Sequence, residues 1–130
     1  MSTVGTDEMV TAVFRDIDRM DAAEFARAFA EDGTFKFGNQ PAAVGKSAVE
    51  EAVADFFAML GGLHHETTGV WSGRWEGGEV RSVEGLVVYT RKDGSVVEPI
   101  PYVSTLRVEG DLIKDYRVFA DISPLFAQSN

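Results

Sequence analysis

The chain has 130 residues, of which 45% are hydrophobic and 25% charged, a size and balance typical of one globular domain, taken here as residues 1–130. Its 12 Lys and Arg residues against 21 Asp and Glu residues give a formal net charge of −9. This negative excess argues against nucleic acid and anionic membranes as partners, because their phosphate groups would repel the protein. The absence of cysteine excludes disulfides and thiolate metal sites and agrees with a reducing cytoplasm.

Targeting and membrane-spanning signals are also missing from the sequence. Residues 1–8 are polar and acidic, with no basic flank and no apolar run of signal-peptide length. No stretch approaches the roughly 20 apolar residues that a bilayer-spanning helix needs. We therefore expect a soluble cytoplasmic protein.

Three amphipathic helices are predicted in the first half of the chain. Between residues 9 and 20, apolar residues recur at the i, i+3, i+4 spacing of a helix with one buried face. Two further helices begin at capping-box patterns, in which a polar N-cap residue is followed three residues later by glutamate. These patterns are Asp21 with Glu24 and Ser47 with Glu50, and the helices are expected to end at Asp32-Gly33 and at Gly61-Gly62.

The second half of the chain changes to the period-two pattern of strands. The β-rich runs cover residues 63–71, 79–91, 96–108 and 112–122, and a short strand at 34–37 precedes the third helix. Hairpin signals separate the long runs at Gly77-Gly78, Asp93-Gly94 and Gly110-Asp111. Three helices followed by an antiparallel meander predict an α+β fold, with the helices gathered on one face of the sheet.

Four segments carry a resemblance to a known family. In chain order they are Phe29 to Phe35, Gly45 to Ser47, Asp93-Gly94 and Leu112 to Asp121. In this order and spacing, nearly the whole chain resembles the nuclear transport factor 2-like superfamily and, within it, the SnoaL-like (polyketide cyclase/steroid isomerase-like) proteins. The resemblance implies a cone-shaped fold, with three N-terminal helices on the concave face of a curved antiparallel sheet and a pocket between them. It does not imply one function, because the superfamily includes isomerases, epoxide hydrolases, polyketide cyclases, dehydratases and binding proteins.

Alternation along the strands predicts which side chains face this pocket. The less polar set of each strand suits the concave side, and phenylalanines from the helices and the short strand complete the wall. The expected ligand-binding residues are Phe14, Phe37, Phe57, His65, Val87, Tyr89, Tyr102, Ser104, Tyr116 and Val118. A register slip of one residue would exchange the two faces.

The resemblance also implies positions for known catalytic groups, and these positions lack carboxylates. The aspartate base of steroid isomerases corresponds to Phe37 or to a position near Gly38, and their oxyanion-hole aspartate corresponds to about Ser104. The closing-strand aspartate of limonene-type epoxide hydrolases and of SnoaL-type cyclases corresponds to Val118. Since none of these side chains here is a carboxylate, three familiar mechanisms lack their key group.

The remaining catalytic candidates are His65, Tyr89 and Tyr102. Histidine side chains titrate near about pH 6.5 and can act as base or acid, and tyrosine hydroxyls can stabilise an enolate oxygen. The alternative is that these rings only line the pocket, with their polar atoms satisfied by the protein. Asp115 and Asp121 are the acid/base candidates if the register slips; otherwise they belong to a charged stripe on the convex face.

The neighbouring His64 and His65 point to opposite faces of a strand, so they are poorly placed to chelate one ion. We therefore expect no metal and no other cofactor. Three functions stay open. The protein is an isomerase-, cyclase- or hydrolase-type enzyme acting on a small carbonyl or polyketide-like compound, a non-catalytic binding protein for a similar hydrophobic molecule, or an interaction module. A homodimer through an apolar convex sheet face is expected in each case.

Overall fold

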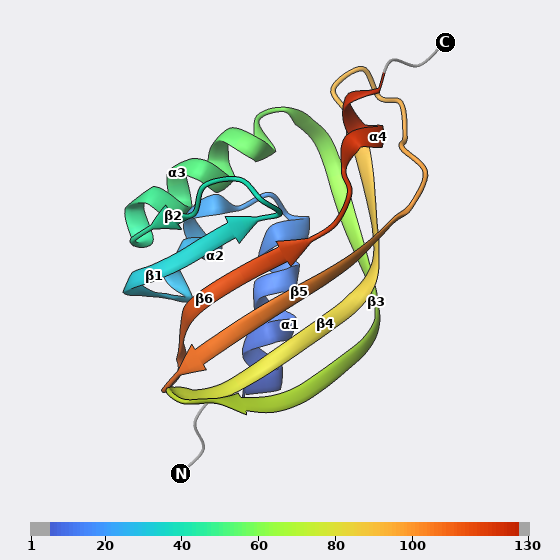
Figure 1. Ribbon diagram of the computed structural model, residues 1–130. Coiled ribbons are helices and arrows are strands. Elements are labelled where there is room, and N and C mark those ends of the chain that lie inside the picture. The colour runs from blue at the N-terminus through green and yellow to red at the C-terminus, as the bar shows by residue number, and fades with distance from the viewer. Residues whose placement is uncertain (1–5, 128–130) are drawn as a thin grey trace.

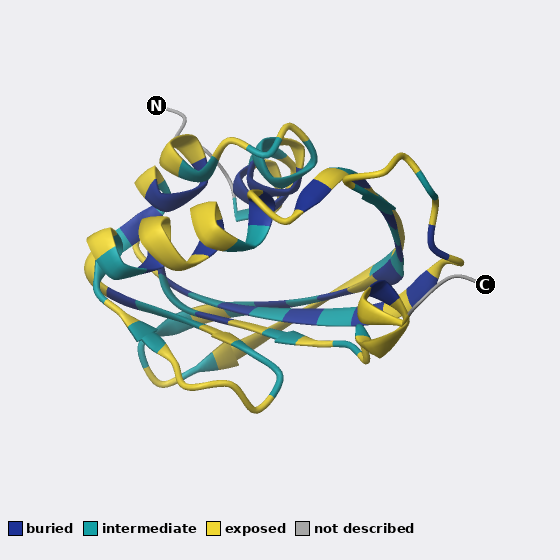
Figure 2. Ribbon diagram, turned by 90° about the horizontal axis from the view of Figure 1, so that it is seen from above, coloured by how far each residue is buried: buried dark blue, intermediate teal, exposed yellow. Residues whose placement is uncertain are grey.

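The computed structural model describes residues 6–127, in which a curved six-stranded sheet carries helices on one face (Figures 1 and 2). The helices are α1 (Thr6–Asp18), α2 (Ala22–Arg27), α3 (Lys46–Phe57) and α4 (Ser123–Phe126). The strands are β1 (Phe29–Phe37), β2 (Ala43–Val44), β3 (Leu60–Trp75), β4 (Gly78–Arg91), β5 (Ile100–Glu109) and β6 (Leu112–Phe119). The predicted α+β class is confirmed, as is the placement of three helices over one face of the sheet.

The strand order is β2-β1-β6-β5-β4-β3, so the meander from β3 to β6 is antiparallel throughout. The exception to this pattern is β1, which pairs in parallel with β6. This pairing brings the N-terminal half of the chain beside the last strand and gives the sheet its full width (Figure 1).

Two predicted helix ends are wrong, and in both cases strand pairing takes residues that the sequence pattern assigns to a helix. Helix α2 ends at Arg27, because Ala28 accepts a hydrogen bond from the Ile113 N–H of β6 at 2.8 Å and Phe29 starts β1. Helix α3 ends at Phe57, and Gly61 lies within β3. A Cβ at Gly61 would lie 2.5 Å from the Arg91 carbonyl oxygen, so glycine permits this close approach of strands.

Helix starts follow the capping prediction in one case only. The Asp21 carboxylate accepts a hydrogen bond from the Glu24 N–H at 3.1 Å, which confirms the predicted N-cap of α2. Helix α3 instead begins at Lys46 after Gly45, with φ of +96°, and has no side-chain cap, so the prediction for Ser47 is wrong. Glycine at position 45 adopts this left-handed backbone turn without steric penalty.

Two further differences concern the C-terminal half. Strand β5 begins at Ile100 rather than at residue 96, and Val96 forms only an isolated bridge with Thr90. The expected strand 112–122 ends at Phe119, and α4 follows it. The Asp121 carboxylate accepts a hydrogen bond from the Ser123 N–H at 3.0 Å just before this short helix.

The buried core lies between α1–α3 and the sheet. Helix α1 contributes Val13, α2 contributes Phe25 and α3 contributes Val49, all at most 1% exposed. The sheet meets them with Leu106 and Ile113, both 0% exposed. This packing leaves a hollow farther along the concave face.

Candidate functional site

The hollow is a cavity of about 340 Å³ between the helices and the concave face of the sheet. This volume lies at the lower end of the range for small-molecule sites, roughly 300–1,000 Å³. The predicted ligand-binding residues that line it are Phe37, Phe57, His65, Val87, Tyr89, Tyr102, Ser104, Tyr116 and Val118. The inward-facing set predicted by strand alternation therefore matches the side of the sheet that the helices cover.

Phe14 is the one remaining residue of the predicted set, and it contacts the site from outside the cavity lining. Its ring packs edge-on against the His65 ring, with centroids 5.2 Å apart. It also lies 6.0 Å from the ring of Tyr102. Phe14 therefore fixes the orientation of two lining residues.

One side of the cavity is a phenylalanine wall, made of Phe25, Phe35, Phe37, Phe56 and Phe57 from α2, β1 and α3. Its rings contact one another and the tyrosines of the sheet. Phe37 lies 5.7 Å from Phe56, and Phe25 lies edge-on to Tyr116 at 5.4 Å. This wall offers a ligand apolar contact without hydrogen bonds.

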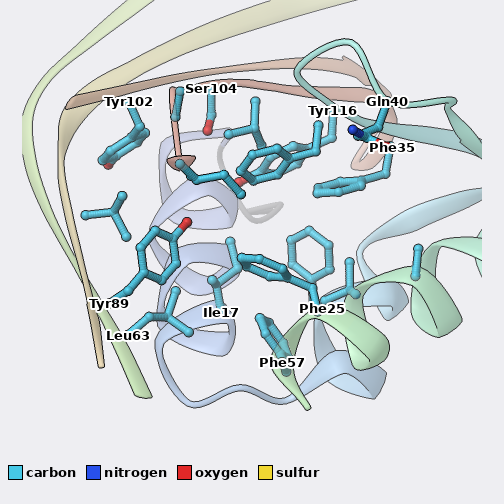
Figure 3. Close-up of a pocket in the computed structure, with 18 of the residues that line it drawn as sticks. Ile17, Phe25, Phe35, Gln40, Phe57, Leu63, Tyr89, Tyr102, Ser104 and Tyr116 are labelled. Carbon is cyan, nitrogen blue, oxygen red and sulfur yellow. The ribbon is translucent and has the colours of Figure 1, made fainter. Parts of the chain in front are cut away.

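The opposite side is a hydroxyl wall, made of Tyr89, Tyr102, Ser104 and Tyr116 from β4, β5 and β6. Figure 3 shows the hydroxyl groups of Tyr89 and Ser104 directed toward the middle of the cavity. Burial raises the pKa of Tyr89 to about 12. Burial also raises the pKa of Tyr102 and Tyr116, and for Tyr116 the hydrogen bond with Ser104 opposes the rise. The phenols therefore stay neutral near pH 7 and can donate hydrogen bonds.

His65 on β3 is held at the cavity by Asp18, the last residue of α1. The His65 Nδ1 lies 2.7 Å from Asp18 Oδ1, and the His65 backbone N–H donates to Asp18 Oδ2 at 3.2 Å. A carboxylate can only accept, so Nδ1 carries the proton of a neutral ring and Nε2 is left with a lone pair. Among the described residues no protein group is hydrogen-bonded to Nε2, and no buried side-chain nitrogen or oxygen lacks a partner, so Nε2 is an accessible atom of a side chain that lines the cavity.

The sequence prediction missed Asp18. Its spacing held a signal, because Asp18 is four residues after Phe14 and therefore on the same face of the helix. That signal does not distinguish it from Asp21, seven residues after Phe14, without knowledge of where α1 ends and which strand it meets.

The fallback candidates lie away from the cavity lining. Asp115 accepts hydrogen bonds from the Thr34 hydroxyl at 2.6 Å and from the Arg117 Nε at 2.8 Å. Asp121 precedes α4 at the surface. The register slip that would have turned these carboxylates inward is therefore absent.

One end of the cavity is closed by the segment around α4, which contributes Ile122 and Phe126 to the lining. Arg91 on β4 holds this segment: its guanidinium donates to the carbonyl oxygens of Leu125 at 3.1 Å and of Pro124 at 2.9 Å. These bonds stabilise the end of a short helix, where the Pro124 carbonyl oxygen also accepts a hydrogen bond from the Ala127 N–H at 3.3 Å.

Charge is absent from the lining itself. None of the described residues that line the cavity is Asp, Glu, Lys or Arg. Within residues 6–127, no three His, Cys, Asp or Glu side chains are grouped so that they could hold a metal ion. None of the helices in that range is long and apolar enough to cross a membrane.

Helices over the concave face of a curved, unclosed sheet, with a cavity between them, define the nuclear transport factor 2-like fold. The family model of the SnoaL-like domain matches residues 10–116, and the chain belongs to that family. No curated protein matches the sequence.

Solved structures share the fold at low sequence identity. A hypothetical protein with a ketosteroid isomerase-like fold from Catenulispora acidiphila, in complex with trimethylamine, is 22% identical over 96% of this chain and 94% of its own, with a TM-score of 0.80. A putative SnoaL-like polyketide cyclase from Jannaschia sp. CCS1 is 17% identical over 97% and 93%, with a TM-score of 0.75. TerC, co-crystallized with polyporic acid, is 13% identical over 92% and 94%, with a TM-score of 0.75.

Proposed function

We propose that the protein binds a small, largely apolar carbonyl compound in the cavity and moves a proton on it with His65. The observation that carries this proposal is the 2.7 Å contact between His65 Nδ1 and Asp18 Oδ1 at the wall of a cavity without charged lining residues. The SnoaL-like family supports it, and so do structural neighbours described as a polyketide cyclase and as a complex with polyporic acid.

The chemistry follows from the roles that the geometry allows. His65 Nε2 accepts a proton from a carbon next to the carbonyl group, and the Asp18 carboxylate stabilises the imidazolium that results. The oxygen that gains negative charge is stabilised by hydrogen bonds from Tyr89, Tyr102 or Ser104. Return of the proton from His65 to another carbon completes an isomerisation. In a ring closure the carbanion instead forms a bond to a second carbonyl carbon of the same molecule, and the oxygen of that carbonyl takes the proton from His65. Relatives in the family carry catalytic carboxylates at the positions that Phe37 and Val118 occupy here. In this protein, His65 and Asp18 perform the proton transfer instead.

Exchange of carbon-bound hydrogen tests the proposal without knowledge of the natural substrate. The probe is 2-tetralone in deuterated water, with the exchange of its protons next to the carbonyl followed by NMR. We expect the protein to accelerate exchange, His65→Gln to abolish the acceleration and Asp18→Asn to reduce it by about 100-fold. Asp16→Asn is the matched control, since it removes a carboxylate from the same helix end, and it leaves the rate unchanged.

The second candidate function is ligand binding without a reaction, favoured by the replacement of the family's usual acid positions by Phe37 and Val118. The same experiment separates the two functions. A binding protein shifts the NMR signals of its cavity residues on addition of 2-tetralone, yet gives the same exchange rate as its His65→Gln variant. That result would refute the enzymatic proposal and leave the binding function.

We also propose that two copies pair through the convex sheet face, away from the cavity. Large apolar side chains are exposed on the strands, with Trp71 on β3 54% exposed and Phe119 on β6 51% exposed. Burying them between two copies removes apolar area from water. Sedimentation at micromolar concentration is expected to give the mass of a dimer, and Phe119→Glu is expected to give a monomer. The absence of cysteine supports a cytoplasmic location for this dimer.

A further inference from the structure

Asp18 has a second imidazole neighbour that the proposed reaction does not use. Its Oδ2 lies 3.5 Å from the Nδ1 of His64, while its Oδ1 lies 2.7 Å from the Nδ1 of His65. The two histidines differ in environment, because the His64 side chain is 68% exposed and that of His65 is 12% exposed. One carboxylate therefore joins an imidazole in solvent to an imidazole at the cavity.

This arrangement arises at the edge of the sheet. Strand β3 is the last strand in the order, and the end of α1 lies beside it, so Asp18 reaches both neighbouring residues of the strand. Strand alternation turns His65 toward the cavity and His64 toward solvent. Although the two side chains leave the strand on opposite faces, a carboxylate with two oxygens can contact both rings.

We propose that His64 regulates the catalytic pair: through the shared Asp18, the charge of His64 in solvent controls how readily His65 takes up a proton. This inference rests on the proposed function, because His64 would regulate the proton transfer by His65. Both imidazolium ions would compete for one negative charge and repel each other. Protonation of His64 therefore makes protonation of His65 less favourable, and the two titrations are coupled.

The other charged groups around the pair do not change charge in the relevant range. From α1, Arg15 and Arg19 flank Asp18 in sequence, and from β3, Glu66 shares the outer face with His64. Strand β4 presents Val87 and Val88 opposite the two histidines, and β5 presents the neutral Tyr102. As classes, arginine, carboxylate and tyrosine side chains keep their charge between about pH 6 and 8, so imidazoles are the groups that respond there.

The chain is well suited to a direct test, because it has two histidines. The experiment follows the ring signals of the ¹⁵N-labelled protein by NMR during a pH titration, without any ligand. We expect His64→Gln to raise the titration midpoint of His65 by roughly 0.3 to 1 pH unit, because the competing positive charge is gone. His64→Lys keeps a positive charge at all relevant pH values and is expected to lower the midpoint.

Two further variants show whether the effect passes through Asp18. Arg74→Gln removes a positive charge from the exposed far end of the same strand, beyond the Debye length of about 8–10 Å, and is expected to leave the His65 midpoint unchanged. In an Asp18→Asn background, His64→Gln is expected to give less than about half of its original shift. His64 is exposed, so its substitution leaves the fold intact.

The inference fails if the His65 midpoint in His64→Gln stays within about 0.1 pH unit of the original, or if the shift is equally large in the Asp18→Asn background. Its outcome is separate from that of the proposed function. A midpoint shift without any exchange of 2-tetralone would support the coupling and refute the enzyme. Exchange without a midpoint shift would support the enzyme and refute the regulatory role of His64.

Discussion

The two walls of the cavity share a sheet and a core, yet they offer a ligand different interactions. The phenylalanine wall presents apolar rings alone, and their contribution to binding grows with the area removed from water, without regard to direction. The hydroxyl wall presents neutral donors at fixed positions, with His65 at its β3 end. Hydrogen bonds depend on distance and angle, so this wall orients a ligand. The comparison indicates that affinity and orientation are supplied by different elements of the fold.

The same comparison applies to stability. Residues of the phenylalanine wall continue directly into the core, as Phe25 does at 1% exposure. The hydroxyl groups of the hydroxyl wall add less stability: that of Tyr102 pairs with the Thr67 hydroxyl at 3.3 Å, and the buried Tyr89 is compatible with the fold only while it stays protonated. Substitutions in the two walls are therefore expected to differ in their effect on the free energy of unfolding.

Phe25→Ala tests the apolar side of the comparison. Its ring contacts those of Phe29, Phe35 and Tyr116 at centroid distances between 5.2 and 5.8 Å. We expect a loss of about 3–5 kcal/mol in the free energy of unfolding, measured by urea denaturation, because the truncation leaves a void in the core. The control Phe126→Ala removes a cavity ring that is 59% exposed and is expected to lose under about 1 kcal/mol. Equal losses would contradict the division.

Alkaline pH tests the hydroxyl wall. The pKa of Tyr89 is raised to about 12 in the folded protein, whereas unfolded tyrosine ionises near about 10. The folded state thus keeps a proton that the unfolded state loses, so stability falls as the pH rises from about 10 to 12, by about 2–3 kcal/mol from Tyr89. Urea denaturation at several pH values measures the fall. Tyr89→Phe is expected to make the fall smaller by that amount, while Tyr102 and Tyr116, whose pKa values burial also raises, continue to contribute. An unchanged slope in that variant would contradict the assignment.

Ser104→Ala tests the pairing within the hydroxyl wall. The Ser104 hydroxyl bonds that of Tyr116, which is 1% exposed. Loss of this partner leaves a buried hydroxyl unpaired, and we expect a loss of about 1–3 kcal/mol in the free energy of unfolding. Thr105→Ala, at the next position on the opposite face of β5, serves as the control and is expected to change stability by under about 0.5 kcal/mol.

Tyr102→Phe is expected to have the smallest effect on stability. It separates the contribution of the hydroxyl wall to the reaction from its contribution to stability. Its hydroxyl lies 3.3 Å from the Thr67 hydroxyl, a weak contact at the edge of the cavity. We expect a change under about 1 kcal/mol in the free energy of unfolding. Exchange of 2-tetralone, however, is expected to slow by about 10-fold, because a donor to the developing oxygen charge is lost. A rate equal to that of the unchanged protein would remove Tyr102 from the proposed reaction.

The parts of this protein that could be predicted from the sequence depend on local patterns. Apolar periodicity located α1 and the long strands, and strand alternation placed Ser104, Tyr116 and Val118 on the concave side. The capping box at Asp21 predicted an N-cap that the structure contains. Each of these signals depends on residues within a few positions of one another, which is the range over which backbone geometry repeats.

Element ends and the pairing at the site depended on contacts between distant segments. Phe29 leaves the helical pattern because β6 offers it a strand partner, and Gly61 continues a strand because β4 lies close to it. These contacts override local propensity, since pairing and burial contribute more free energy than a helix end does.

The sequence by itself determined the charge balance, the order of the three main helices and the long strands, and the concave-side residues at the cavity, because these follow from composition and from periods of two and 3.6 residues. The tertiary structure alone decided that a void remains beneath the helices and that Asp18 meets His65, 47 positions away. Such a contact depends on where one helix ends against one strand edge, and no local period encodes that meeting.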